Sequence, residues 1–268
     1  MDEVEEILAR LREGNGLSNE EIARLGPAQL PELRELARSP EREVRRSTLT
    51  ALTVMKAPGC DDVYFQAVRE TEDDLPYIAL GGLEDGLEPR HQPELLAIYD
   101  THPEGRIRGA IAQTIGTLEG RGDFWGLRKR ADAEQDDDAR EGLRMALARM
   151  GDGPSREEIA RRLPALRENR LRLFLQHDLE YLKAPWIQKP LLPLLDDQSI
   201  HLDMRSVWHG QAGAEIPPQF CQRERVCDRV AVWVADISGR RFSFPTERMV
   251  EFTPAQLEEV RAYLRGLP

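Results

Sequence analysis

The stretch Ile107–Leu118, IRGAIAQTIGTL, decides the fold of this chain. Its apolar residues recur at Ile107, Ile111, Ile115 and Leu118, which is the spacing of one face of an α-helix. The stretch therefore predicts an amphipathic helix that buries this face against a neighbouring element. The same pattern recurs before and after it, so it predicts the architecture of most of the chain as well as one helix.

Four further segments carry the pattern. They begin at Val44, Leu75, Ala139 and Leu171, and together with Ile107 the starting positions lie 31, 32, 32 and 32 residues apart. The four sets are Val44, Thr48, Leu52 and Met55; Leu75, Ala79, Leu83 and Gly86; Ala139, Leu143, Leu147 and Met150; and Leu171, Leu175, Leu179 and Leu182. A second, independent apolar series between these segments keeps the period of 32 residues: Val63, Leu95, Leu127, Ile159 and Leu191.

Each unit of the repeat therefore contains two helices, which we name the A helix and the B helix in chain order. A unit of this length with two helices is typical of an α-solenoid. One helical hairpin cannot bury both of its apolar faces, so successive hairpins stack and share a core. We expect an all-α fold, a right-handed α-solenoid of about six hairpins that forms a single domain over residues 1–268.

The two ends of the chain lie outside the repeat. Residues 1–26 predict two short helices, and Ser18 with Glu21 forms a capping box for the second. Residues 241–268 predict a final helix. Because the end hairpins of a solenoid would otherwise expose apolar surface, we expect both segments to act as caps.

The repeats occupy residues 27–240, and the sixth is interrupted. Its A helix is predicted at Ile187–Leu195, but its B helix begins only at Val226, more than one and a half periods after Leu171. The excess length between the two helices predicts an insertion at about 197–222.

The net charge of −11 is unevenly distributed along the chain. Residues 1–150 hold 20 Lys and Arg against 31 Asp and Glu, whereas residues 151–268 hold 17 of each. An acidic surface repels phosphate backbones, so nucleic acid is an unfavourable partner and a basic protein is a favourable one. The alternative is that the charge serves solubility alone.

Membrane and secretory segments are not evident in the sequence. No apolar run approaches the roughly 18 residues of a membrane span, and the N-terminus is acidic where a signal peptide is basic. Three cysteines argue against a disulfide framework. We expect a cytoplasmic protein.

An arginine and an acid recur with the B helices. Arg45, Arg108, Arg140 and Arg172 each follow the first apolar position of a B helix. The acids Glu41, Glu104, Asp136 and Glu168 stand four residues before them. The ladder of charges could bind a peptide. The alternative is structural: the acids cap their helices and the arginines pair within or between units. Recurrence at the period of the repeat favours the structural interpretation.

The repeated unit resembles the HEAT-like repeats of bacteria, the short kind also found in bilin lyases. SPEREVRRSTLTALTVM, HPEGRIRGAIAQTIGTL and QDDDAREGLRMALARM carry the resemblance, which covers about residues 28–240. It implies an interaction scaffold whose B helices line the concave face. The patterns of tetratricopeptide and ankyrin repeats do not fit.

The insertion contains residues of metal-ligand types. His201, Asp203, His209 and Cys221 lie in it, and Cys227 and Asp228 follow, but their spacing matches no zinc pattern. We therefore predict no metal. Trp208 and His209 in a long loop are better candidates for binding a partner, because aromatic residues contribute strongly to interface energy. The alternative is that Trp208 packs over the last repeat.

The sequence predicts a non-enzymatic protein that binds another protein, which could be basic, on its concave B-helix face. An inhibitor or immunity protein that neutralises a toxin is one form of this function. The expected contact positions lie one or two residues off the core register, and Phe174 and Trp233 stand out because they are large. They are Arg46, Thr50, Gln113, Arg144, Phe174, His177, Arg229 and Trp233.

Two alternatives come from other functional classes. HEAT-like DNA glycosylases bind DNA on a concave face, but such a role needs a basic groove. A lyase or cofactor-attachment role is implied only by the likeness to bilin lyases. We predict no catalytic residues and no cofactor, because the sequence has no phosphate-binding loop, no nucleophile elbow and no acid–base pair placed by spacing.

Overall fold

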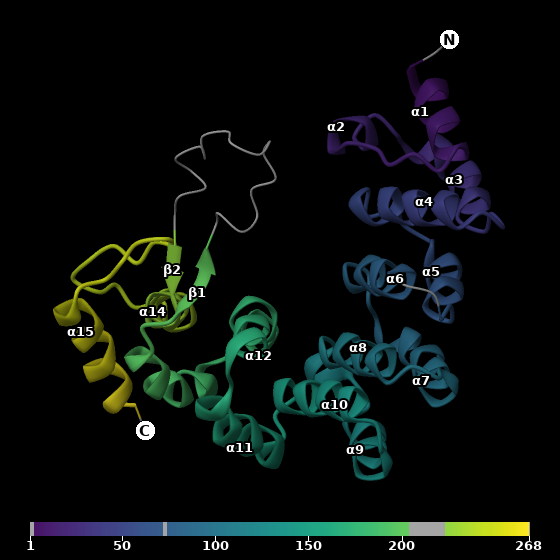
Figure 1. The fold of residues 1–268 in the computed structure, drawn as a ribbon. Coiled ribbons are helices and arrows are strands. Elements are labelled where there is room, and N and C mark those ends of the chain that lie inside the picture. The colour runs from purple at the N-terminus through teal and green to yellow at the C-terminus, as the bar shows by residue number, and fades with distance from the viewer. Residues whose placement is uncertain (1–2, 72–73, 204–222, 268) are drawn as a thin grey trace. The chain divides into compact units, whose positions relative to one another are not determined.

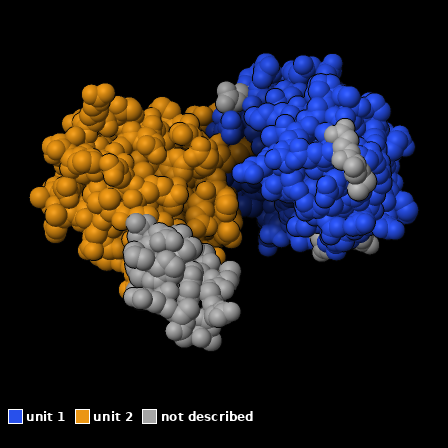
Figure 2. All heavy atoms as spheres, turned by 90° about the horizontal axis from the view of Figure 1, so that it is seen from above, with its two compact units in different colours: residues 1–150 blue, residues 151–268 orange. Residues whose placement is uncertain are grey.

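The computed structural model describes residues 3–71, 74–203 and 223–267. These residues form the helices α1 to α15 and several short 3₁₀ turns, together with one ladder of two short strands (Figure 1). The all-α fold class is therefore confirmed. The chain divides into two compact units, Met1–Met150 and Gly151–Pro268, where the sequence predicts one continuous domain (Figure 2).

Unit 1 consists of two cap helices followed by helical hairpins. The cap helices are α1 (Glu3–Arg12) and α2 (Asn19–Ile22), and the predicted capping box of Ser18 and Glu21 opens α2. The A helices are α3 (Leu30–Leu36), α5 (Asp61–Val68), α7 (Gln92–Thr101) and α9 (Phe124–Ala133). The B helices are α4 (Arg42–Val54), α6 (Leu75–Glu84), α8 (Gly105–Gly116) and α10 (Asp137–Arg149).

The hairpins of unit 1 pack in chain order. Each A helix contacts the B helix that follows it, and the B helices contact one another in the series α4, α6, α8, α10. Within this unit Figure 1 shows the A helices in one layer and the B helices in another. The predicted core positions Val44, Leu75, Ile107 and Leu143 are all buried, whereas the last position of the pattern is only partly buried at Met55.

Arg108 connects two successive hairpins. Its Nη1 donates to the carbonyl oxygens of His102 and Pro103, at distances of 2.9 and 3.0 Å, in the turn before α8. Its Nε and Nη2 donate to the two carboxylate oxygens of Glu134, at 3.1 and 3.0 Å, at the end of α9. Tyr99 also donates to Glu134, at 2.7 Å. The hydrogen bonds from Arg108 lower the pKa of Glu134 to about 2.

The same connection occurs two units earlier, where Arg45 pairs with Glu70 at 2.9 Å and donates to the carbonyls of Ser39 and Pro40. The structural interpretation of the repeated arginines is thus correct for these two residues, which pair between units. The acid four residues before is not the partner in either case. Glu41 and Glu104 make no side-chain cap, and among the described cap side chains of this series only Asp136 accepts backbone N–H groups.

Glycine allows α8 and α10 to approach backbone to backbone. A Cβ placed on Gly142 would lie within 3.0 Å of Gly109 Cα and O, and one placed on Gly109 would lie similarly close to the Asp138 carbonyl. No side chain fits between the helices at this point, so the contact requires glycine.

Unit 2 is less regular. Its helices are α11 (Gly153–Arg162), α12 (Glu168–Leu173), α13 (Leu179–Leu182), α14 (Val226–Ser238) and α15 (Pro254–Arg265). A π-helical turn, Phe174–Asp178, joins α12 to α13, and the predicted core residues of this segment, Leu171 to Leu182, are buried. The final helix predicted within residues 241–268 is confirmed as α15, and a capping box of Thr253 and Gln256 opens it.

The predicted A helix Ile187–Leu195 is wrong in type. Residues Lys189–Asp196 form a 3₁₀ helix that contains Pro193 in its interior. Proline has no N–H and clashes with the preceding turn of an α-helix, which disfavours the α form here. Strand β1 (Ile200–Asp203), at the start of the predicted insertion, pairs in antiparallel orientation with β2 (Arg223–Arg225), which directly follows the insertion.

We expect Gly142→Ala to destabilise the protein by about 1–3 kcal/mol, because the added methyl group must push α8 from α10. Gly81→Ala on α6 is the matched control. Nothing lies within 4 Å of a Cβ at Gly81. Alanine should therefore stabilise that helix by about 0.5–1 kcal/mol. Denaturant unfolding measures both changes, and equal effects of the two substitutions would contradict the close contact.

We expect Glu134→Gln to lower the free energy of unfolding by about 2 kcal/mol at neutral pH, because Arg108 loses its counter-charge in a largely buried site. The folded pKa of about 2 lies below the ordinary 4.5, so the stabilisation is complete above about pH 4.5 and is lost as the pH falls toward 2. The variant should lack this part of the acid dependence in urea unfolding.

Glu35→Gln is the control for that experiment. Glu35 pairs with Arg38 three residues later and its side chain is 79% exposed. The substitution should change stability by less than about 0.5 kcal/mol. If Glu134→Gln changed the free energy of unfolding equally little, the connection between the hairpins would not contribute to stability.

Candidate functional site

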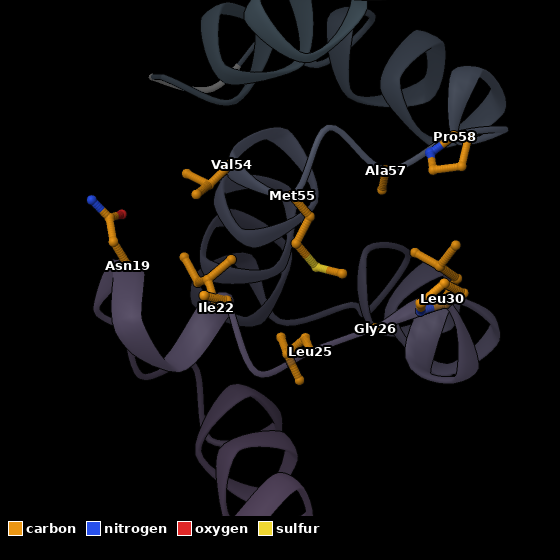
Figure 3. A pocket seen from close by; sticks show the side chains of 11 residues that line it. Asn19, Ile22, Leu25, Gly26, Leu30, Val54, Met55, Ala57 and Pro58 are labelled. Carbon is orange, nitrogen blue, oxygen red and sulfur yellow. The ribbon is translucent and has the colours of Figure 1, made fainter.

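Unit 1 contains an apolar pocket of about 330 Å³ between α2, the start of α3 and the turn from α4 to α5. Its lining side chains include Ile22, Leu25, Leu30 and Met55, and Figure 3 shows Ile22 and Leu25 pointing toward the same space as Met55. Asn19 is the one polar side chain among the residues that line it. The pocket is therefore suited to an apolar group.

The end of α4 forms one wall of the pocket. Lys56 has a left-handed backbone conformation, with φ of 51°. The N–H of Lys56 donates to Thr53 O and the N–H of Ala57 to Leu52 O, which are the two hydrogen bonds of a Schellman motif. This motif ends α4 sharply and turns Ala57 and Pro58 into the lining.

Helix α2 forms the opposite wall. The capping box of Ser18 and Glu21 begins the helix, and Glu21 also forms an ion pair with Arg10 on α1. Gly26 donates its N–H to the Gln29 side chain at 2.9 Å, which shapes the turn toward α3. These local interactions hold the short helix Asn19–Ile22 against α4.

An exposed stripe on α4 leads to the pocket. Arg46, Thr50 and Val54 are spaced by four residues and share one helix face, which we call the α4 stripe. All three are exposed, Val54 to 46%, and Val54 also lines the pocket. Arg46 donates to Asp74 at 2.7 Å, and that hydrogen bond raises the pKa of Arg46.

The α4 stripe contains two of the predicted contact residues, Arg46 and Thr50. Val54 and the pocket were missed by sequence reasoning. The available signal was an apolar residue four positions beyond Thr50, outside the core register. Gln113 on α8 and Arg144 on α10 are half-buried and lie on helices that do not line the pocket, so the structure does not bring them to this site.

Phe174, Arg229 and Trp233 are wrong as surface contact residues. Their exposed fractions are 4%, 8% and 3%. Phe174 stands three residues after Leu171 and next to Leu175, so it shares the buried face of this helical segment. Among the other candidates beyond Met150, His177 is exposed, and Trp208 and His209 lie outside the part of the chain that the structure describes.

Helix α14 is buried on every side from Val226 to Ala235, which explains why Arg229 and Trp233 are not on the surface. Trp233 donates its Nε1–H to Leu175 O at 3.1 Å, and the Arg229 guanidinium lies 4.8 Å from the centre of the Trp233 ring. The segment VCDRVAVWVADIS is apolar almost all round, and this was the signal that both residues belong to the core.

Unit 2 also contains a buried polar cluster near the two strands. His201 is 5% exposed, and its ring nitrogens have no hydrogen-bond partner among the described residues. Burial lowers the pKa of His201 to about 4. Glu224 is 1% exposed and accepts from Arg248 at 3.2 Å. Within the described residues no group of three or more His, Cys, Asp or Glu side chains could hold a metal ion.

Comparison with known proteins finds no matching family model, no matching curated protein and no matching solved structure. Among the helices formed by residues 3–71, 74–203 and 223–267, none combines the length and apolar character needed to cross a bilayer.

We expect stability to fall as the pH is lowered from about 6.5 to about 4, because the folded pKa of His201 lies below its ordinary value of 6.5 and the unfolded chain takes up the proton first. His201→Gln should remove a loss of up to about 3 kcal/mol over this range. Unfolding curves at several pH values measure it. If the free energy of unfolding of the wild type and of His201→Gln depended on pH in the same way, His201 would not be the cause of the loss of stability.

Proposed function

We propose that this chain is a HEAT-like α-solenoid that binds another protein without catalysing a reaction. The observation that carries the proposal is the α4 stripe: Arg46, Thr50 and Val54 are exposed on a B helix and lead to an apolar pocket. Among the described residues that line this pocket, none carries an acidic, basic, thiol or imidazole group for acid–base or nucleophilic chemistry.

The contacts of unit 1 support the solenoid architecture. The A and B helices alternate, the B helices pack in chain order, and Arg45 and Arg108 each pair with an acid of the next hairpin. Such nearest-neighbour contacts, repeated at the period of the sequence, are the basis of repeat proteins. A right-handed superhelix follows as part of this proposal.

The charge of unit 1 favours a basic partner, since opposite potentials accelerate association and favour the correct partner. An inhibitor or immunity protein that covers a basic toxin is the specific form that fits. Such a protein would act in the cytoplasm, where Cys60 and Cys227, which are free and buried within the described part of the chain, would remain reduced.

Affinity capture with the immobilised protein, followed by mass spectrometry and titration of the retained partner, tests the proposal. Thr50→Arg places a long charged side chain in the middle of the α4 stripe, and we expect the partner to bind at least about ten-fold more weakly. Ala97→Arg is the matched control, because Ala97 is exposed on the A helix α7.

The control should bind as the wild type does. A partner that Thr50→Arg retains with unchanged affinity would exclude the α4 stripe as its binding surface. The capture of no protein at all would count against the scaffold function as a whole.

A further inference from the structure

We propose that the pocket beside α2 receives one large apolar side chain from a basic segment of the partner. This inference rests on the proposed function and names the chemistry that the α4 stripe and the pocket recognise together. The occupant is a peptide segment that carries Lys or Arg residues and a single anchor such as Leu, Phe or Trp.

The lining of the pocket argues for an apolar anchor. Ile22, Leu25, Leu30, Val54 and Met55 present hydrocarbon or thioether groups, and Asn19 supplies the one polar side chain. Sites for small molecules place several convergent polar groups around the ligand. A volume of about 330 Å³ is at the low end for such ligands and accommodates one large side chain.

The charge around the pocket argues for a basic segment. Residues 1–100, which contain the whole lining, hold 11 Lys and Arg against 22 Asp and Glu. Each of these eleven cations forms an ion pair with a carboxylate of the same region: Arg10, Arg12, Arg24, Arg34, Arg38, Arg42, Arg45, Arg46, Lys56, Arg69 and Arg90. The excess negative charge therefore remains for a cationic ligand.

The positions of the paired cations strengthen this argument. Arg46, on the α4 stripe, donates to Asp74 at 2.7 Å, and Lys56, beside the lining residue Met55, lies 3.1 Å from Asp85. Neither side chain would repel a basic segment as a free cation would. A peptide that follows the stripe from Arg46 to Val54 arrives at the pocket, in the manner of anchored peptides that bind grooves.

Selection from a displayed library of random peptides of about 15 residues, the length at which a helix can begin to form, tests the inference without prescribing a sequence. The wild-type protein is the bait and Ala23→Trp is the counter-selection. Ala23 lines the pocket and is exposed, so the indole can fill the pocket without entering the core. Ala97→Trp is the matched control on α7.

We expect enriched peptides to be rich in Lys and Arg and to share one large apolar residue. Their dissociation constants should rise about 10- to 100-fold on Ala23→Trp, or when the anchor is replaced by alanine, because a large apolar side chain is no longer buried. Binding should weaken as the salt concentration rises. Ala97→Trp should leave the affinity unchanged.

A second substitution guards against a misfolded variant. Val54→Asn makes the mouth of the pocket polar at an exposed position, and Val250→Asn changes an equally accessible valine, the exposed fractions being 46% and 41%. Only Val54→Asn should weaken the binding of the peptides to the protein. Circular dichroism of each variant establishes that its helices are intact.

Several outcomes would overturn the inference. The first three are that no peptide is enriched, that the enriched peptides share an acidic or wholly polar consensus, and that they bind the wild type and Ala23→Trp with equal affinity. The fourth is a concentration-dependent dimer of the protein that Ala23→Trp abolishes, because the occupant of the pocket would then be a second copy of the chain. If Thr50→Arg weakens peptide binding but Ala23→Trp does not, the pocket is not the binding site of the anchor, whereas the proposed function still stands. If Ala23→Trp weakens peptide binding but Thr50→Arg does not, the pocket receives the anchor and the α4 stripe is not part of the binding surface.

Discussion

The hydrogen bonds of Arg108 are the interaction on which the order of unit 1 depends. One guanidinium holds the turn before α8 and both carboxylate oxygens of Glu134 at the end of the next A helix. Charge-assisted, two-pronged pairing of this kind fixes geometry as well as adding energy. Arg45 pairs with Glu70 in the corresponding place, through a single hydrogen bond from Nη2. In the unit between them, where Pro76 replaces the arginine, His102 Nε2 lies 3.1 Å from Glu70 O. A connection that recurs between hairpins is explained by the packing of the hairpins and carries no information about a partner.

The period of the repeat predicted the helical pairs and most of the core from sequence alone, because burial repeats wherever packing repeats. Ile107, Leu143 and Leu175 are buried as their register requires. The failures occur where local chemistry departs from the period. Pro193 turns an expected α-helix into a 3₁₀ helix, and a π-helical turn, Phe174–Asp178, interrupts the expected helix from Leu171 to Leu182. Neither departure changes the spacing of the leucines, so the periodic pattern could not reveal it.

The periodic pattern could not predict the pocket either, for a different reason. Its walls come from Asn19–Leu30 and Val54–Pro58, segments that lie largely outside the core register and meet only after folding. The sequence indicated the exposed positions Arg46 and Thr50 and the acidic charge, but the sharp end of α4 at Lys56 is what brings Met55 and Ala57 to face Ile22. The proposed binding site therefore lies where the N-terminal helices meet the first hairpin.

The glycine contact between α8 and α10 has a consequence for how such an array can grow. Gly109 and Gly142 are useful only as a pair, because each leaves room for the backbone of the other helix. A duplicated hairpin inserted between them would set a glycine-bearing face against a helix with side chains at that position. Duplication is the ordinary route by which repeat arrays lengthen, and at this joint it would leave a void or a clash. We therefore expect additional units to fit on either side of the third and fourth hairpins more readily than between them.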